Sequence, residues 1–240
     1  MTDSIELTSN REIREALLQS VQARDVLQKM RVAYWARIQA VECGDDEASP
    51  ALMRRWELWH ERFMIQEAQA TEEMEELASD MPIVEIMCGV KGVGKTFASR
   101  LVSQIDITKS NSVSAMWRYC GYGVDENGER DKPKKGEKLK YNRRAKAVTH
   151  LIGVSLIRRG SPYREIYDKA REKYETEERY ADWTKAHYHM AALRKVKKLF
   201  LSHLWEVWRD LEGLPVSKPY VFEHGGHAKK EEPRDYGWLV

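Results

Sequence analysis

Residues 89–96 read Gly89-Val90-Lys91-Gly92-Val93-Gly94-Lys95-Thr96, and two unrelated folds use such a sequence. The segment matches the phosphate-loop (P-loop) pattern G-x-x-x-x-G-K-T, in which backbone N–H groups and the lysine bind phosphates and the threonine holds Mg²⁺. It also contains Gly92-Val93-Gly94, the Gly–apolar–Gly turn of a helix-hairpin-helix, whose second helix begins with N–H groups that bind a DNA phosphate. The first interpretation requires an α/β fold and the second an all-α fold.

The sequence on both sides of this glycine turn (residues 89–94) favours the helix-hairpin-helix. A phosphate-loop fold needs a parallel sheet of several buried strands, but the residues that follow show helical patterns and no apolar strand that ends in Asp or Glu. The run before the turn contains Pro82 and Glu85, which suit a central strand poorly. In the helix-hairpin-helix, Val93 packs into the core while Lys91 and Lys95 add positive charge toward the phosphate. A nucleotide-binding loop and a purely structural turn remain the alternatives.

Residues 9–42 and about 50–79 are predicted to form two long helices that pack as an antiparallel hairpin of coiled-coil type. Ser49 suits an N-cap, and apolar or aromatic side chains recur every three or four residues in both segments. Arg24 and Gln66 interrupt the two apolar stripes. We expect this hairpin, residues 1–80, to have little core of its own and therefore to contact a protein partner or a second copy of the chain.

Asp80-Met81-Pro82 breaks the helical pattern and marks a domain boundary. The domain 81–213 is predicted to contain helices over about 96–105, 112–120, 141–159, a segment opened by Ser161-Pro162, and 182–211. Asn127-Gly128 is typical of the turn of a small β-hairpin. Residues 214–240 are predicted to be an extended tail. The predicted fold class is all-α: a long antiparallel helical hairpin, followed by a helix-hairpin-helix domain with one small β-hairpin.

Positive charge is concentrated after the hairpin. Residues 1–80 have a net charge of −8 and residues 81–240 of +10, and from 130 to 159 there are 11 basic side chains against two acidic ones. Such a tract beside a helix start favours contact with a phosphate backbone. Together with Lys91, Gly92, Val93, Gly94, Lys95 and Thr96, the candidate nucleic-acid contacts are Lys132, Lys134, Lys135, Lys138, Lys140, Arg143, Arg144 and Lys146. A second cluster suits a phosphate contact and a polar helix face equally well: Arg194, Lys195, Lys197 and Lys198.

Four segments, in order along the chain, resemble motifs of the C-terminal domain of insertion-sequence-110 family transposases. Val90–Ala98, with SRLVSQIDI after it, is similar to their glycine-rich signature, and Trp117–Gly121 is similar to a short segment that follows it. The basic tract 130–144 and His189–Leu199 are similar to a later basic segment and to the closing helix. The similarity covers about residues 82–210, and the hairpin before it resembles the coiled coil of that family.

The chain differs from this family in the two parts that carry catalysis, the nuclease domain and the serine nucleophile. The RuvC-like nuclease domain, with its four acidic metal ligands, has no counterpart before the hairpin. Met116–Val148 contains neither Ser nor Thr, so the family's serine nucleophile also has no counterpart. The resemblance therefore implies binding of DNA, or of structured RNA, without strand transfer. We predict a non-catalytic DNA-binding protein of phage or mobile-element type, which needs neither a cofactor nor a metal.

The sequence also argues against several other classes of protein. No run approaches the ~18 apolar residues of a membrane span, and the first ten residues lack the basic and apolar regions of a secretory signal. Cys43, Cys88 and Cys120 stand too far apart for a disulfide framework or a zinc motif, so we expect a cytoplasmic, nucleoid-associated protein. Two alternative functions stay open: a P-loop NTPase that uses Gly89–Thr96, and a structural or assembly protein that reuses a transposase-like domain.

Overall fold

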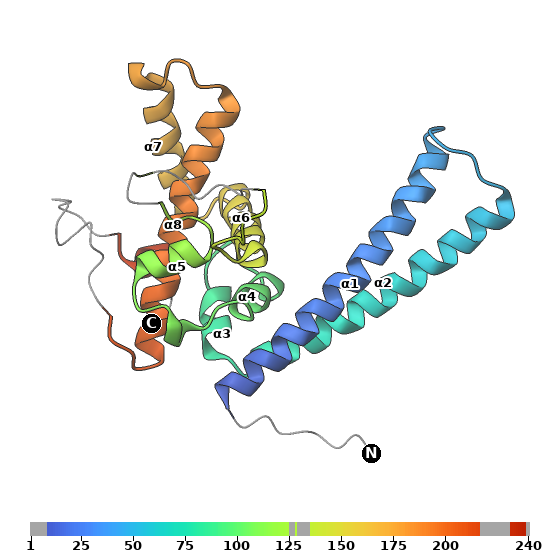
Figure 1. Ribbon diagram of the computed structural model, residues 1–240, viewed down its shortest axis with the longest axis horizontal. Coiled ribbons are helices and arrows are strands. Elements are labelled where there is room, and N and C mark those ends of the chain that lie inside the picture. Colours follow the sequence, from blue (N-terminus) through green and yellow to red (C-terminus); the bar gives the residue numbers. More distant parts are fainter. Residues whose placement is uncertain (1–8, 125–127, 129–134, 217–230, 239–240) are drawn as a thin grey trace. The chain divides into compact units, whose positions relative to one another are not determined.

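The computed structural model describes residues 9–124, 128, 135–216 and 231–238. Every regular element in these ranges is a helix, which confirms the all-α prediction. The small β-hairpin is not seen: Asn127 lies outside the described residues, and the described segments on either side of it contain no strand. The chain divides into two compact units, Met1–Met81 and Pro82–Val240 (Figure 1).

The first unit is a helical hairpin of α1 (Asn10–Glu42) and α2 (Pro50–Ser79). Serine side chains set both helix starts, because the hydroxyls of Ser9 and Ser49 each accept a hydrogen bond from a backbone N–H in the first turn of the helix that follows. The link between the helices is short, so they run antiparallel and pack along their length (Figure 1).

A buried ion pair occupies the two interruptions in the apolar stripes of the hairpin. Glu67, which follows Gln66, accepts hydrogen bonds from Arg24 Nη2 at 2.8 Å and from Arg31 Nε at 2.5 Å. Glu67 and Arg24 are both buried, and Arg24 Nε also donates to Thr71 Oγ1 at 3.3 Å. The polar interruptions in the two apolar stripes therefore correspond to one polar contact between α1 and α2. Because a slip of register would leave a buried charge unpaired, this contact fixes the alignment of the helices.

The second unit is built around α8 (Lys185–Leu211), whose inner face is buried over most of the helix. The helices that pack on α8 are α3 (Pro82–Cys88), α5 (Val113–Tyr119), α6 (Arg143–Arg158) and α7 (Tyr163–Thr176). α4 (Lys95–Val102) packs on α3 and α6. Trp205 and Trp208 lie at the centre of this core, and Trp205 Nε1 donates to the backbone carbonyl of Ser110 at 2.7 Å.

The prediction of an extended tail over residues 214–240 is wrong near the C-terminus. Pro233–Tyr236 forms a 3-10 helix, and the side chain of Trp238 is 1% exposed. Trp238 Nε1 donates to Tyr163 Oη at 2.8 Å, and Tyr163 Oη donates to His203 Nδ1 at 2.6 Å. The aromatic side chains of this segment bury enough apolar surface to hold it on α7 and α8, although the residues around them are typical of loops.

Candidate nucleic-acid interface

The glycine turn joins two helices. The run before it, which a phosphate-loop fold requires as a strand, is α3, and the run after it is α4. Val93 N donates to Val90 O at 2.9 Å, and both valine side chains are buried. Gly94 is the N-cap of α4, and its carbonyl accepts the N–H groups of Phe97 and Ala98. The local geometry is therefore helix, tight turn, helix.

Gly92 and Gly94 serve the turn in different ways. Gly92 has a φ of +101°, which L side chains rarely adopt. A Cβ atom at Gly92 would lie 3.2 Å from Leu156 Cα and 3.2 Å from Ser155 O in α6. Ser155 Oγ also donates to Gly92 O at 2.7 Å, which fixes the turn to α6. Gly94 has a φ of −96°, and a Cβ atom there would meet nothing within 4 Å, so its lack of a side chain instead keeps the start of α4 accessible.

The surface at the glycine turn suits an anion. Lys91 and Gly94 are exposed, and Lys95 and Thr96 are partly exposed. The N–H groups at the start of a helix precede its first intrahelical hydrogen bonds, and the helix dipole adds partial positive charge at that end. Together with the two lysines, the start of α4 can bind one phosphate of a nucleic-acid backbone.

The N-terminus of α6 holds the described part of the basic tract. Asn142 caps the helix, since its Oδ1 accepts the N–H groups of Arg144 and Ala145 at 2.9 and 3.0 Å. Asn142 Nδ2 donates to Tyr119 Oη at 2.8 Å, which joins the start of α6 to the end of α5. Arg143 and Arg144 are exposed. The other described members of the tract are exposed or half-buried: Lys135, Lys138, Lys140 and Lys146. Lys132 and Lys134 lie outside the described residues.

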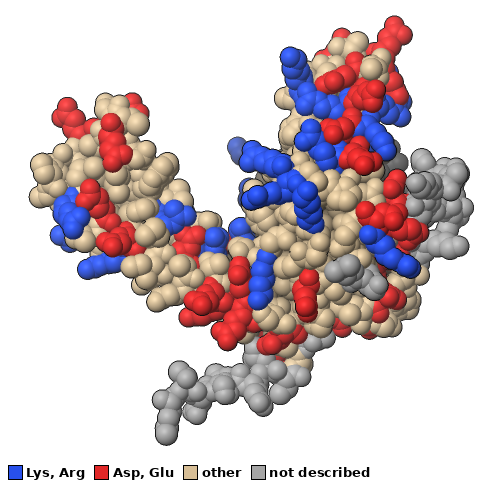
Figure 2. Space-filling model, turned by 180° about the vertical axis from the view of Figure 1, so that it is seen from behind, with Lys and Arg blue, Asp and Glu red and all other residues tan. Residues whose placement is uncertain are grey.

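The structure places the glycine turn and the basic tract at opposite ends of α6. The turn contacts Ser155 near the C-terminus of this helix, whereas Asn142 caps its N-terminus. At ~1.5 Å rise per residue, α6 separates these two points by about 20 Å. Arg158 and Arg159 are counted in the basic stretch 130–159 but are not among the named candidate contacts, and they are exposed at the C-terminal end of α6, three and four residues after Ser155. Figure 2 shows Lys and Arg side chains grouped on the side of the second unit where α6 lies.

The second basic cluster, on α8, is used largely inside the unit. Arg194 Nη2 donates to the backbone carbonyls of residues 122 and 123 at 2.5 and 3.0 Å, and Lys197 is buried. Lys198 Nζ lies 3.7 Å from the centre of the Trp117 ring. Burial and the nearby Arg194 lower the pKa of Lys198 to about 8. Arg194, Lys197 and Lys198 attach α5 and the link after it to α8, whereas Lys195 is exposed. Most of this cluster is therefore engaged inside the unit.

The hydroxyl groups of Tyr119 and Tyr122 and the thiol of Cys120, all near the basic tract, are engaged in the fold. Tyr119 Oη donates to Gln104 O at 2.5 Å, and Tyr122 Oη donates to Lys146 O at 3.0 Å. Burial raises the pKa of the Cys120 thiol to about 12, and it also raises the pKa of the Tyr122 hydroxyl above its ordinary value. Groups with raised pKa values are poor nucleophiles at neutral pH, because the reactive anion is scarce.

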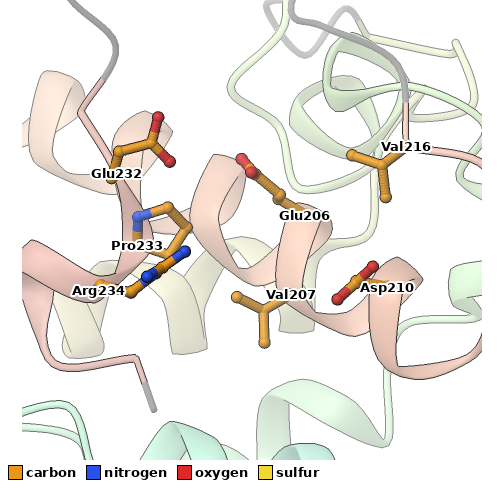
Figure 3. Close-up of a pocket in the computed structure, with 7 residues that line it drawn as sticks. All are labelled: Glu206, Val207, Asp210, Val216, Glu232, Pro233 and Arg234. Carbon is orange, nitrogen blue, oxygen red and sulfur yellow. The ribbon is translucent and has the colours of Figure 1, made fainter. Parts of the chain in front are cut away.

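A cavity of about 220 Å³ lies between α8 and the C-terminal segment (Figure 3). Glu206, Asp210 and Glu232 line it together with Arg234, so its charge disfavours a phosphate group. No residue of the glycine turn contributes to its lining. In the described part of the chain, no three His, Cys, Asp or Glu side chains are placed to hold a metal ion.

Two comparisons with known proteins bear on the resemblance described above. The sequence matches no protein-family model, and it matches no curated protein. The resemblance to insertion-sequence-110 transposases therefore stays a prediction. Among the helices that the structure describes, none is both long and apolar enough to cross a bilayer.

Proposed function

We propose that the second unit binds the sugar–phosphate backbone of duplex DNA and does not cleave it. The observation that carries this proposal is the attachment of the glycine turn to α6 through Gly92 and Ser155. This attachment supports an arrangement in which two groups of basic side chains, one at each end of α6, contact the same nucleic acid. The turn site comprises Lys91, Gly94, Lys95, Thr96, Arg158 and Arg159, and the cap site comprises Lys135, Lys138, Lys140, Arg143, Arg144 and Lys146.

The distance between the two sites favours a duplex over a single strand. A separation of about 20 Å equals about six base pairs at ~3.4 Å per pair, so a stiff duplex presents phosphates to both sites at once. A flexible single strand has to be ordered before it can do so, and that ordering costs free energy. Because phosphate contacts carry no base information, the proposed binding is independent of sequence.

The salt dependence of binding tests this proposal. Fluorescence anisotropy with labelled duplex DNA, single-stranded DNA and RNA gives the slope of log K against log salt. Each phosphate contact adds about −0.9 to that slope, which corresponds to a factor of about 3.5 in the binding constant between 50 and 200 mM salt. A variant that lacks one contact should therefore lose about 3.5-fold less affinity over this range than the wild type does.

Single variants locate the contacts within the second unit. Lys91→Ala at the turn site and Arg143→Ala at the cap site should each make the slope less steep by about 1. Lys169→Ala is the matched control, since Lys169 is exposed on α7 outside both sites. Affinity that does not change with salt, or variants with the slope of the wild type, would refute DNA binding and favour the structural or assembly protein.

The same protein preparation tests the chemical part of the proposal. Labelled ATP with Mg²⁺ should not bind, and supercoiled plasmid with Mg²⁺ or Mn²⁺ should not be nicked. Magnesium-dependent ATP binding that Lys95→Ala abolishes would support the phosphate-loop alternative instead. Nicking that Tyr122→Phe abolishes would show that the second unit is catalytic.

The resemblance to a transposase domain supports a place for this protein in a phage or another mobile element, with the nucleoid in the cytoplasm as its site of action. We assign protein contacts to the first unit. Its hairpin has only two helices and few buried apolar side chains, such as Leu17, Val21 and Met74, whereas most of the buried apolar side chains lie in the second unit. Deletion of residues 1–80 should therefore change the oligomeric state and leave DNA binding in place.

A further inference from the structure

The C-terminal segment, which we define as residues 231–238, reaches the glycine turn. The contact is made by Gly237: a Cβ atom at this position would lie 3.3 Å from Gly89 O and 3.6 Å from Val90 Cα. Both atoms belong to the backbone of the turn, which cannot swing aside as a flexible side chain can. The glycine turn therefore packs on two elements, on α6 at Gly92 and on the C-terminal segment at Gly89.

Gly237 ends the 3-10 helix Pro233–Tyr236 at the point of this contact. Its φ is +89°, and its N–H group donates to Arg234 O at 3.2 Å. L side chains rarely adopt such a φ. Any other residue here would strain the end of the 3-10 helix, and its side chain would also push the C-terminal segment away from the turn. Glycine therefore meets two requirements at this one position.

Buried aromatic side chains on both sides of Gly237 anchor the C-terminal segment. The indole of Trp238 is 1% exposed, packs on Phe200 with ring centres 5.4 Å apart and donates to Tyr163 Oη at 2.8 Å. The side chain of Tyr236 is also buried, and its ring centre lies 4.5 Å from that of Tyr163. Because these anchors flank Gly237 in the sequence, Gly237 cannot leave the glycine turn without loss of core packing.

We propose that the C-terminal segment positions the glycine turn for a DNA phosphate, with Gly237 as the positioning residue. The proposal rests on the function proposed above for the turn site. Val93 N donates to Val90 O, and Gly94 caps α4, so a shift of Val90 is carried through the turn to the start of α4. Phosphate binding needs the N–H groups there in fixed positions. Docking of the segment and binding of DNA should therefore favour each other.

Amide hydrogen exchange of the full chain without DNA, followed by NMR, tests the positioning by itself. Gly237→Ala should raise the exchange rate of the Val93 amide, which bonds across the turn, by about threefold or more. Gly213→Ala is the matched control, because Gly213 has a φ of +64° and a Cβ atom there would meet nothing within 4 Å. Both variants carry the strain of a positive φ, so a difference between them reports the contact with the turn.

A second variant loosens the anchor and leaves Gly237 in place. Trp238→Phe keeps an aromatic ring but loses the hydrogen bond to Tyr163, so it should also raise the exchange rate of the Val93 amide. Far-UV circular dichroism and thermal unfolding establish that each variant is folded. If Gly237→Ala is unfolded, Trp238→Phe decides.

Fluorescence anisotropy with labelled duplex DNA measures the consequence for binding. Gly237→Ala should lower the affinity by about 3- to 30-fold, as expected for coupling between packed segments, and Gly213→Ala by less than about twofold. In the wild type, duplex DNA should in return slow exchange of the Trp238 amide.

Three results would overturn the proposal. They are an unchanged Val93 exchange rate in folded Gly237→Ala and Trp238→Phe, equal effects of Gly237→Ala and Gly213→Ala, and faster exchange that leaves DNA affinity at the wild-type level. A wild type that does not bind DNA would refute the function proposed for the second unit, and the exchange rates alone would then decide whether the segment holds the turn.

Discussion

Replacement of Gly92 by alanine should destabilise the second unit, whereas the same replacement at Gly94 should not. At Gly92 the φ of +101° strains any L residue, and the new methyl group would lie 3.2 Å from Leu156 Cα and Ser155 O. At Gly94 the φ of −96° suits alanine, and no atom lies within 4 Å of the added Cβ. A comparison of the two variants therefore distinguishes the effect of backbone strain and steric contact from the effect of replacing any glycine by alanine.

The structure gives the size of both effects. Backbone strain at Gly92 costs about 1–3 kcal/mol. Loss of the hydrogen bond from Ser155 Oγ, if the turn moves away from α6, costs about 1 kcal/mol more. Gly92→Ala should thus lower the free energy of unfolding by about 2–4 kcal/mol. Gly94→Ala should change it by less than about 1 kcal/mol, because the reduced freedom of the unfolded chain is offset by the poorer N-cap preference of alanine at the start of α4.

Urea unfolding followed by circular dichroism measures these changes. With an m-value of about 2 kcal/mol per molar urea, Gly92→Ala should lower the midpoint by roughly 1–2 M. In DNA-binding assays, Gly92→Val and Gly94→Val should each weaken binding more than Lys95→Ala does. The glycines set the shape and access of the site, whereas the lysine adds one screened charge. Equal midpoints for Gly92→Ala and the wild type would refute the argument, as would a Gly94→Ala variant that is equally destabilised.

Three further predictions concern other parts of the chain. Glu67→Ala leaves the buried Arg24 with Asp25 of its own helix as its remaining carboxylate contact and should lower hairpin stability by up to about 3–5 kcal/mol, while Arg24→Met combined with Glu67→Leu should restore most of it in the same urea assay. Trp238→Ala removes a buried indole and its hydrogen bond to Tyr163, and should cost about 3–5 kcal/mol in thermal unfolding. Lys198 should titrate near pH 8 in NMR of ¹³C-methylated lysines. Because its folded pKa lies below the unfolded value, the unfolded chain binds more protons above pH 8, so stability should rise with pH there, and Lys198→Met should flatten that rise.

Local sequence signals predicted most of the helices, because caps and turns act through neighbouring residues. Ser49 caps its helix as expected and the helix predicted from residue 112 begins after Ser112, while α8 begins after Thr184 although the predicted helix starts at 182. The interruptions at Arg24 and Gln66 were visible as defects in a pattern. Their explanation, the pairing with Glu67, depends on residues 43 positions apart that no local pattern connects.

The candidate site was predictable in its parts and not in its arrangement. The glycine motif and the basic tract were recognised separately, but their separation follows from the packing of Gly92 on Ser155. A contact of this kind, between residues 63 positions apart, has no signature in composition or spacing. Trp238 was missed for a related reason: glycines, prolines and charged residues precede it, and only the pocket around Tyr163 makes its indole a core residue.

The docking of Trp238 has a consequence for how the protein folds. Its hydrogen bond to Tyr163 spans 75 positions, and Arg209 bonds to the carbonyl of Ile107 across 102. To form such a contact, the chain must bring two distant segments together, and the loop between them loses conformational entropy before the contact compensates for it. Folding is therefore slower than in helical bundles that are held by local contacts. During synthesis, α7 and α8 are made before the indole that covers them, since Trp238 follows the end of α8 at Leu211 by 27 residues. Until then the aromatic surface of Tyr163 and Phe200 is open to chaperones or to misassembly with other nascent chains.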